Sequence, residues 1–126
     1  MRIQRRRPLE LRSERADIAV VIDVVRMTST AAALMSRPSC SGVDVAATLD
    51  DVARLPPTEL ERVVVSELAG ASRLDHDGDS AWVDNSPAQV LRMTWAERAP
   101  VLVTTNGTRT LLAAAECADR VLLASF

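Results

Sequence analysis

The segment TTNGTR, at residues 104–109, has the residue types and spacing to bind an anion. Gly107 relieves the steric limit on a tight turn from a strand into a helix and lets an anion approach the backbone. Around it stand three hydroxyls, an amide and a guanidinium, namely Thr104, Thr105, Thr108, Asn106 and Arg109. The spacing leaves two interpretations open: a cradle for a phosphate or sulfonate group, or an ordinary N-capped turn with a surface arginine.

A second segment, IDVVRMTST at residues 22–30, also places polar side chains directly after an apolar run. Asp23 follows the run, Arg26 comes three residues later, and Thr28 opens an alanine-rich stretch. Asp23 is expected to be either a Mg²⁺ ligand or a carboxylate that caps the helix or pairs with an arginine. Glu67 ends another apolar run and is the second candidate ligand, although each carboxylate taken singly is more often structural.

Length and composition restrict the class of protein. A chain of 126 residues with 48% hydrophobic residues predicts a single domain spanning residues 1–126. A net charge of −2 argues against a nucleic-acid partner, and we interpret the basic cluster at residues 2–8 as a solvated edge segment. No apolar run approaches the roughly 18 residues of a membrane span. Cys40 and Cys117 have no metal-site spacing, so free thiols and a cytoplasmic location are expected.

The chain alternates between β-branched runs and helix-forming stretches, each of the latter with a plausible cap. The pattern predicts an α/β fold of three layers, with a mainly parallel or mixed sheet of alternating strands and helices. Residues 69–80 are expected to form a long polar loop, and its acidic turn around His76 does not match a calcium loop. The expected strands are 17–25, 42–47, 62–68, 101–105 and 120–124, and the expected helices are 28–35, 49–55, 86–98 and 108–117.

This fold class predicts that the polar segments converge. In open α/β sheets, ligands bind beyond the carboxyl ends of the strands, where helix N-termini present free N–H groups. Residues 23–30, 66–70 and 104–109 each follow a predicted strand. We therefore expect them to share one edge of the molecule.

Four stretches of the sequence resemble signature segments of the 2-phosphosulfolactate phosphatase family, in the family's order. They are DVVRMTST at 23–30, SELAG at 66–70, VDNSP at 83–87 and TTNGTRTL at 104–111. The last is the most specific, and the resemblance covers nearly the whole chain.

The resemblance implies an α/β, Mg²⁺-dependent phosphatase that hydrolyses the phosphate ester of a sulfonated lactate, a step towards coenzyme M. Asp23, Arg26 and Glu67 would be catalytic, with the two carboxylates as metal ligands or base. The substrate would be a small phosphorylated or sulfonated acid. The residues that would bind its anionic groups are Thr28, Asn85, Ser86, Thr105, Asn106, Gly107, Thr108 and Arg109.

The sequence also departs from the family pattern. Family chains continue past a segment like VLLASF, Asp84 stands where the pattern has a glycine, and Leu68 occupies a position that is otherwise cationic. The alternative is therefore a truncated, non-catalytic relative that binds an oxyanion metabolite or a partner chain, either as a homodimer or with a complementing C-terminal chain. A lyase or cyclase on the same pocket ranks last, because no residue selects it.

Overall fold

The computed structural model describes residues 15–22, 26–38, 40–68, 82–95 and 98–125. Asp23 and the whole predicted polar loop at 69–80, which contains His76, lie outside these residues. The elements follow one another as β1 (Ala16–Ile22), α1 (Met27–Met35), β2 (Asp44–Val45), α2 (Leu49–Val52), β3 (Glu61–Val65), β4 (Trp82–Val83), α3 (Pro87–Arg92), β5 (Arg98–Leu102), α4 (Gly107–Cys117) and β6 (Ala118–Ala124).

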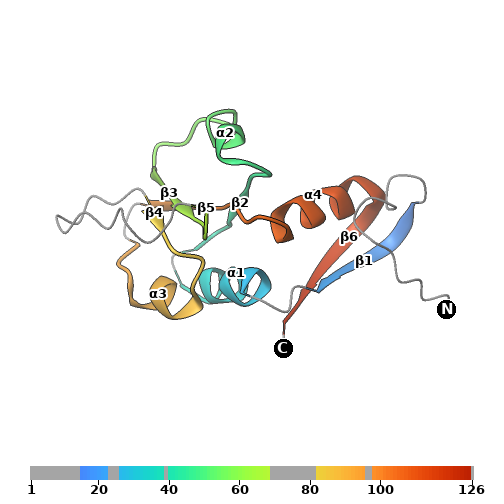
Figure 1. Cartoon of the computed structure of the whole chain (residues 1–126), viewed down its shortest axis with the longest axis horizontal. Helices are drawn as coiled ribbons and strands as arrows, with labels where there is room; N and C mark the ends of the chain where they lie inside the picture. The colour runs from blue at the N-terminus through green and yellow to red at the C-terminus, as the bar shows by residue number, and fades with distance from the viewer. Residues whose placement is uncertain (1–14, 23–25, 39, 69–81, 96–97, 126) are drawn as a thin grey trace.

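Four strands form the larger sheet, in the order β2-β5-β3-β4, and each described pairing in it is parallel. Helices α1 and α3 lie on one face of this sheet and α2 lies on the other (Figure 1). A parallel sheet covered on both faces requires apolar residues on both, which explains the β-branched runs. Val63 and Val65 pack in the cluster with α1 and α3, whereas Val64 packs in the cluster with α2. The three-layer, parallel α/β class predicted from the sequence is confirmed.

Strands β1 and β6 form a separate two-stranded parallel sheet, in which Ala16 pairs with Ala118 and Ile22 with Ala124. We call it the ribbon. Helix α4 runs along one side of the ribbon, which extends away from the larger sheet (Figure 1). The other side carries large exposed side chains: Ile18, Val20, Ile22 and Leu122 are each more than half exposed. The ribbon is therefore covered on only one face among the described residues.

Several element boundaries differ from the sequence prediction: β5, for example, spans Arg98–Leu102 where 101–105 was expected, and β2 spans Asp44–Val45 where 42–47 was expected. Three other differences have identifiable reasons. Helix α3 ends at Arg92 and not at residue 98, because Met93 turns extended and the buried Trp95 indole N–H donates to the Val90 carbonyl oxygen at 2.9 Å. Helix α2 ends at Val52, and its last turn continues only through hydrogen bonds between residues three apart. Strand β4 was not predicted, because a strand of two residues is too short to show an alternation of apolar and polar side chains.

Two of the predicted helix caps are confirmed, whereas α1 is preceded by Arg26 and, among the described residues, has no side-chain cap hydrogen bond, so the hydroxyl cap expected there is wrong. The Thr48 hydroxyl accepts a hydrogen bond from the Asp51 N–H at the start of α2. The Ser86 hydroxyl accepts from the Gln89 N–H at the start of α3, where Pro87 takes the first helical position. No helix among the described residues is long and apolar enough to cross a membrane.

The core predicts a contrast between two leucine substitutions. Leu102→Ala, at a side chain 1% exposed, should lower the free energy of unfolding by about 2–5 kcal/mol because it leaves a cavity. Leu91→Ala, at a side chain 60% exposed on α3, should change it by less than about 0.5 kcal/mol. Urea denaturation followed by circular dichroism measures both. Equal losses would contradict the assignment of the core to the larger sheet.

Candidate functional site

The four strands of the larger sheet end together. Val45 pairs with Leu102, Leu102 with Val65, and Val65 with Val83, so the last residues of all four strands form one row. The ladder continues just beyond that row, where the Ser66 N–H donates to the Val83 carbonyl oxygen at 2.9 Å. The segments that follow these strands therefore lie along one edge, which we call the rim: they begin at Ala46, Val103, Ser66 and Asp84.

Glu67 holds three of these segments together. Its Oε1 atom accepts hydrogen bonds from the Thr105 backbone N–H at 2.7 Å and from the Thr105 hydroxyl at 3.0 Å. Its Oε2 atom accepts from the Asn85 side-chain Nδ2 at 3.0 Å. The segments after β3, β5 and β4 thus meet at one carboxylate, as the sequence predicted for two of them.

The same contacts determine the charge of Glu67. Partial burial raises the pKa of the Glu67 carboxyl, but hydrogen bonds from backbone N–H groups, the Thr105 hydroxyl and the Asn85 amide outweigh it and lower the pKa below its ordinary value. Glu67 is consequently ionised at neutral pH. It is a weak proton acceptor but a well-positioned oxygen ligand.

The turn TTNGTR is organised by its own hydroxyls. The Thr108 N–H donates to the Thr104 hydroxyl oxygen at 3.0 Å, and the Thr104 N–H donates to the Thr108 hydroxyl oxygen at 3.1 Å. The Thr108 hydroxyl in turn donates to the Thr104 carbonyl oxygen. Both side chains are buried, so they shape the turn, and their donors are used within it.

A cleft of about 260 Å³ opens on the β2 side of the rim. The segment after β2, residues 47–50, forms one wall, and Leu68, Thr104, Thr105 and Arg109 form the rest. The exposed Arg109 reaches across, and its Nε atom lies 3.4 Å from the Ala47 carbonyl oxygen. The wall at 47–50 was not predicted, although Thr48 follows a predicted strand and therefore belongs at the carboxyl ends of the strands by the same rule.

Arg26 and Asp84 pair at the β4 end of the rim. The Arg26 Nη1 atom lies 3.4 Å from the Asp84 Oδ2 atom. Arg26 precedes α1 with a φ of 78°, a left-handed conformation that is strained for an arginine. Asp84 departs from the family pattern in the sequence, but its pairing with Arg26 was not predicted.

The remaining predicted residues are divided between surface and interior. Thr105 and Asn106 are exposed at the turn, and within the described structure Asn106 makes no side-chain cap hydrogen bond to α4. Gly107 and Thr28 are buried, the latter inside the first turn of α1. The Ser86 hydroxyl caps α3. Their roles in anion binding stay predictions.

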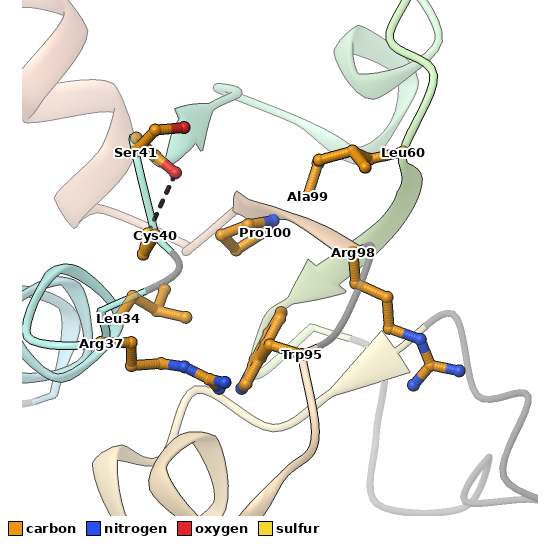
Figure 2. Close-up of a pocket in the computed structure, with 10 residues that line it drawn as sticks. Leu34, Arg37, Cys40, Ser41, Leu60, Trp95, Arg98, Ala99 and Pro100 are labelled. Carbon is orange, nitrogen blue, oxygen red and sulfur yellow. Dashed lines mark hydrogen bonds between the residues drawn. The ribbon is translucent and has the colours of Figure 1, made fainter.

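A second cleft lies at the opposite end of the sheet, beside the first residues of β5 (Figure 2). Its basic side chains already have partners: the Arg37 guanidinium lies 5.1 Å from the centre of the Trp95 ring and donates to the Val90 and Met93 carbonyl oxygens. Burial lowers the pKa of Arg37. These contacts fasten α1 to α3, which is a structural role.

The site can be tested for its fit to a hard cation. Within the described ranges no group of three or more His, Cys, Asp or Glu residues gathers as a metal site. However, the buried Asn85 side chain leaves its Oδ1 atom without a hydrogen-bond partner, while its Nδ2 atom faces Glu67. A carboxylate beside an unpaired amide oxygen is a donor set that Mg²⁺ accepts. Asp23, the other predicted ligand, lies outside the described residues.

Fold and site together define an α/β protein with an ionised carboxylate and guanidinium groups at the carboxyl ends of parallel strands. The 2-phosphosulpholactate phosphatase family model matches residues 5–126. The chain belongs to this family, which confirms the resemblance seen in the motifs.

One curated relative is the probable 2-phosphosulfolactate phosphatase of Thermus thermophilus, which is 33% identical over 109 residues. The match covers 86% of this chain but 43% of the relative, so the chain spans less than half the length of that protein. No solved structure matches the chain.

The reciprocal threonine contacts predict that the turn depends on them. Thr108→Val should lower the free energy of unfolding by about 1–3 kcal/mol, because it leaves the buried Thr104 N–H without its acceptor. Thr110→Val, which removes only a hydroxyl bond to the Asn106 carbonyl oxygen, should cost clearly less. Thermal and urea unfolding measure the difference, and equal losses would argue against the reciprocal pair.

The lowered pKa of Glu67 predicts a pH-dependent stability. Because the folded-state pKa lies below the ordinary 4.5, the contribution is fully present above about pH 4.5 and is lost as the pH falls through the folded-state pKa. Glu67→Gln should thus be most destabilising near neutral pH, with the deficit shrinking in acid. Urea unfolding between about pH 3 and pH 7 measures this. The exposed Glu116→Gln should show a constant, small difference, and the same constancy in Glu67→Gln would refute the assignment.

Proposed function

We propose that this chain provides the anion-binding rim and a metal-binding carboxylate of a Mg²⁺-dependent phosphatase. Its substrate would be a small phosphorylated organic acid, and the family points to the hydrolysis of 2-phosphosulfolactate to sulfolactate. The observation that carries the proposal is the ionised Glu67 carboxylate, held by Thr105 and Asn85 next to the cleft that contains Arg109. The link to coenzyme M synthesis and the cytoplasmic location stay predictions.

The β2 side of the rim suits an oxyanion. Arg109 can donate two parallel N–H groups to a phosphoryl group, and it is exposed at the cleft. The N-terminus of the eleven-residue helix α4 opens at the same turn and favours negative charge. These groups would orient a phosphate ester and offset the charge that develops on its oxygens during attack at phosphorus.

The charge of Glu67 supports the presence of a cation at the proposed site. An ionised carboxylate and a phosphate dianion on the same edge repel each other unless a positive charge lies between them. Glu67 and the unpaired Oδ1 atom of Asn85 would hold Mg²⁺, with Asp23 as a further candidate ligand. When bound, the ion would neutralise the phosphoryl oxygens and polarise the phosphorus centre. The lowered pKa of Glu67 favours the role of ligand over that of general base.

Substitutions at the rim test the proposal by turnover of 2-phosphosulfolactate and of a generic phosphomonoester with Mg²⁺. We expect Glu67→Gln to lower kcat/KM by about 100-fold or more, and Arg109→Ala by about 10- to 100-fold. Glu67→Gln should also raise the Mg²⁺ concentration needed for half-maximal activity.

Two exposed residues serve as matched controls. Glu116→Gln removes the same charge as Glu67→Gln near the far end of α4, and Arg54→Ala removes an arginine that is 78% exposed beside Asp51. Both variants should keep wild-type turnover. Metal-independent turnover, or none with the intact protein, would refute the proposal.

The ribbon favours a second candidate, the non-catalytic relative that associates with another chain. Ile18, Val20, Ile22 and Leu122 expose an apolar face on a parallel pair of strands, and such sheets are normally covered on both sides. We assign this face to a second copy of the chain, because two identical apolar faces related by a twofold axis cover each other.

Light scattering after size-exclusion chromatography tests this candidate. Wild type should form a dimer that Val20→Glu converts to a monomer, since the charge would be buried without a partner. Leu91→Glu, at a side chain 60% exposed on α3, should leave the dimer intact. A monomer at high concentration would eliminate self-association through the ribbon.

A further inference from the structure

Arg26 is a cation at the rim whose charge is already engaged by the protein. It lies 3.4 Å from Asp84, and the two side chains are 50% and 35% exposed, respectively. Asp84 directly precedes Asn85, which donates to Glu67. The ion pair therefore stands beside the carboxylate that organises the site, on the side away from Arg109 and its cleft.

The Arg26–Asp84 ion pair has the properties of a contact in which another anion can replace the carboxylate. Its distance is long for a charge-assisted hydrogen bond, and partial exposure to water weakens the attraction further. The backbone of Arg26 is tied to α1, because its carbonyl oxygen accepts the first helical hydrogen bond from the Thr30 N–H at 2.7 Å. The arginine lies at the start of α1, and among the described residues the partner of its guanidinium is Asp84, at 3.4 Å.

A tetrahedral oxyanion is a stronger partner for a guanidinium than a single carboxylate oxygen at 3.4 Å. A phosphate dianion carries more charge and can accept two parallel N–H groups. We propose that Asp84 competes with the phosphate group of the ligand for Arg26, and so sets the affinity of the rim for phosphate-bearing acids. The ligand binds by displacing Asp84. This inference rests on the proposed function, because it concerns the same rim.

Titration calorimetry with inorganic phosphate, in the presence and absence of Mg²⁺, tests it. Asp84→Asn keeps the shape of the side chain and removes the competing charge, so the Kd for phosphate should fall by about three- to tenfold. Asp119→Asn is the matched control, because Asp119 forms a comparable exposed pair with Arg15 at 3.1 Å on the ribbon. That control should change the Kd by less than about twofold.

A second background separates competition from a general change in net charge. In an Arg26→Gln protein the competition no longer exists, so adding Asp84→Asn should alter the Kd no more than adding Asp119→Asn. An equal gain from Asp84→Asn with and without Arg26 would overturn the inference. Asp84→Ser, which also removes the charge, replaces Asp84→Asn if thermal melting shows that the latter does not fold.

The outcomes also distinguish this inference from the proposed function. Phosphate binding by wild type that Asp84→Asn leaves unchanged would overturn the role of Asp84 and leave the function standing. Absence of phosphate binding in wild type and in both Asp84 variants, with and without Mg²⁺, would overturn both. Tighter binding that depends on Arg26 is the result we expect.

Discussion

The Glu67 carboxylate is the contact on which the rim depends. It follows β3 and accepts hydrogen bonds from the segments after β5 and β4, its neighbours on either side in the sheet. A neutral side chain would accept these bonds more weakly, since bonds to an ionised acceptor are shorter and stronger. The charge of Glu67 therefore stabilises the contacts between three chain segments and places a negative charge in the middle of the rim.

The charges along the rim alternate because of this arrangement. Arg109 lies at the cleft on the β2 side, Glu67 lies between, and Arg26 lies with Asp84 on the β4 side. An anion at the rim would meet two guanidinium groups and also the Glu67 carboxylate, which would repel it. In the proposed function, a Mg²⁺ ion would offset that repulsion.

Helices cover the two sheets of the fold to different extents. The sheet that carries the rim is covered on both faces by helices, so its strand ends are held by two apolar clusters. The ribbon is covered by α4 alone and exposes its other face.

Local patterns in the sequence determined the class of fold and much of the position of the site. Continuous β-branched runs favour strands of a parallel sheet, and Thr48 and Ser86 cap helices through contacts three residues away, so both signals are short-range. The run that begins at residue 17 is nevertheless not buried on both faces in the described structure, because Ile18, Val20 and Ile22 of β1 are exposed. The motif TTNGTR was correctly placed at a junction between strand and helix for the same reason.

Tertiary structure alone decided which side chains share the edge and what each can still bind. The partners of Glu67 lie 18 and 38 residues away, and the partner of Arg26 lies 58 residues away, so no local spacing records them. The side chain of Thr108 is buried, and its hydroxyl donates to the Thr104 carbonyl oxygen. Helix α3 ends before the helical pattern of the sequence does, because the buried Trp95 side chain bonds back to the Val90 carbonyl oxygen. The periodicity of a sequence indicates which side chains of a segment are exposed to water and which are buried. Contacts across the sheet depend instead on the register in which distant strands align.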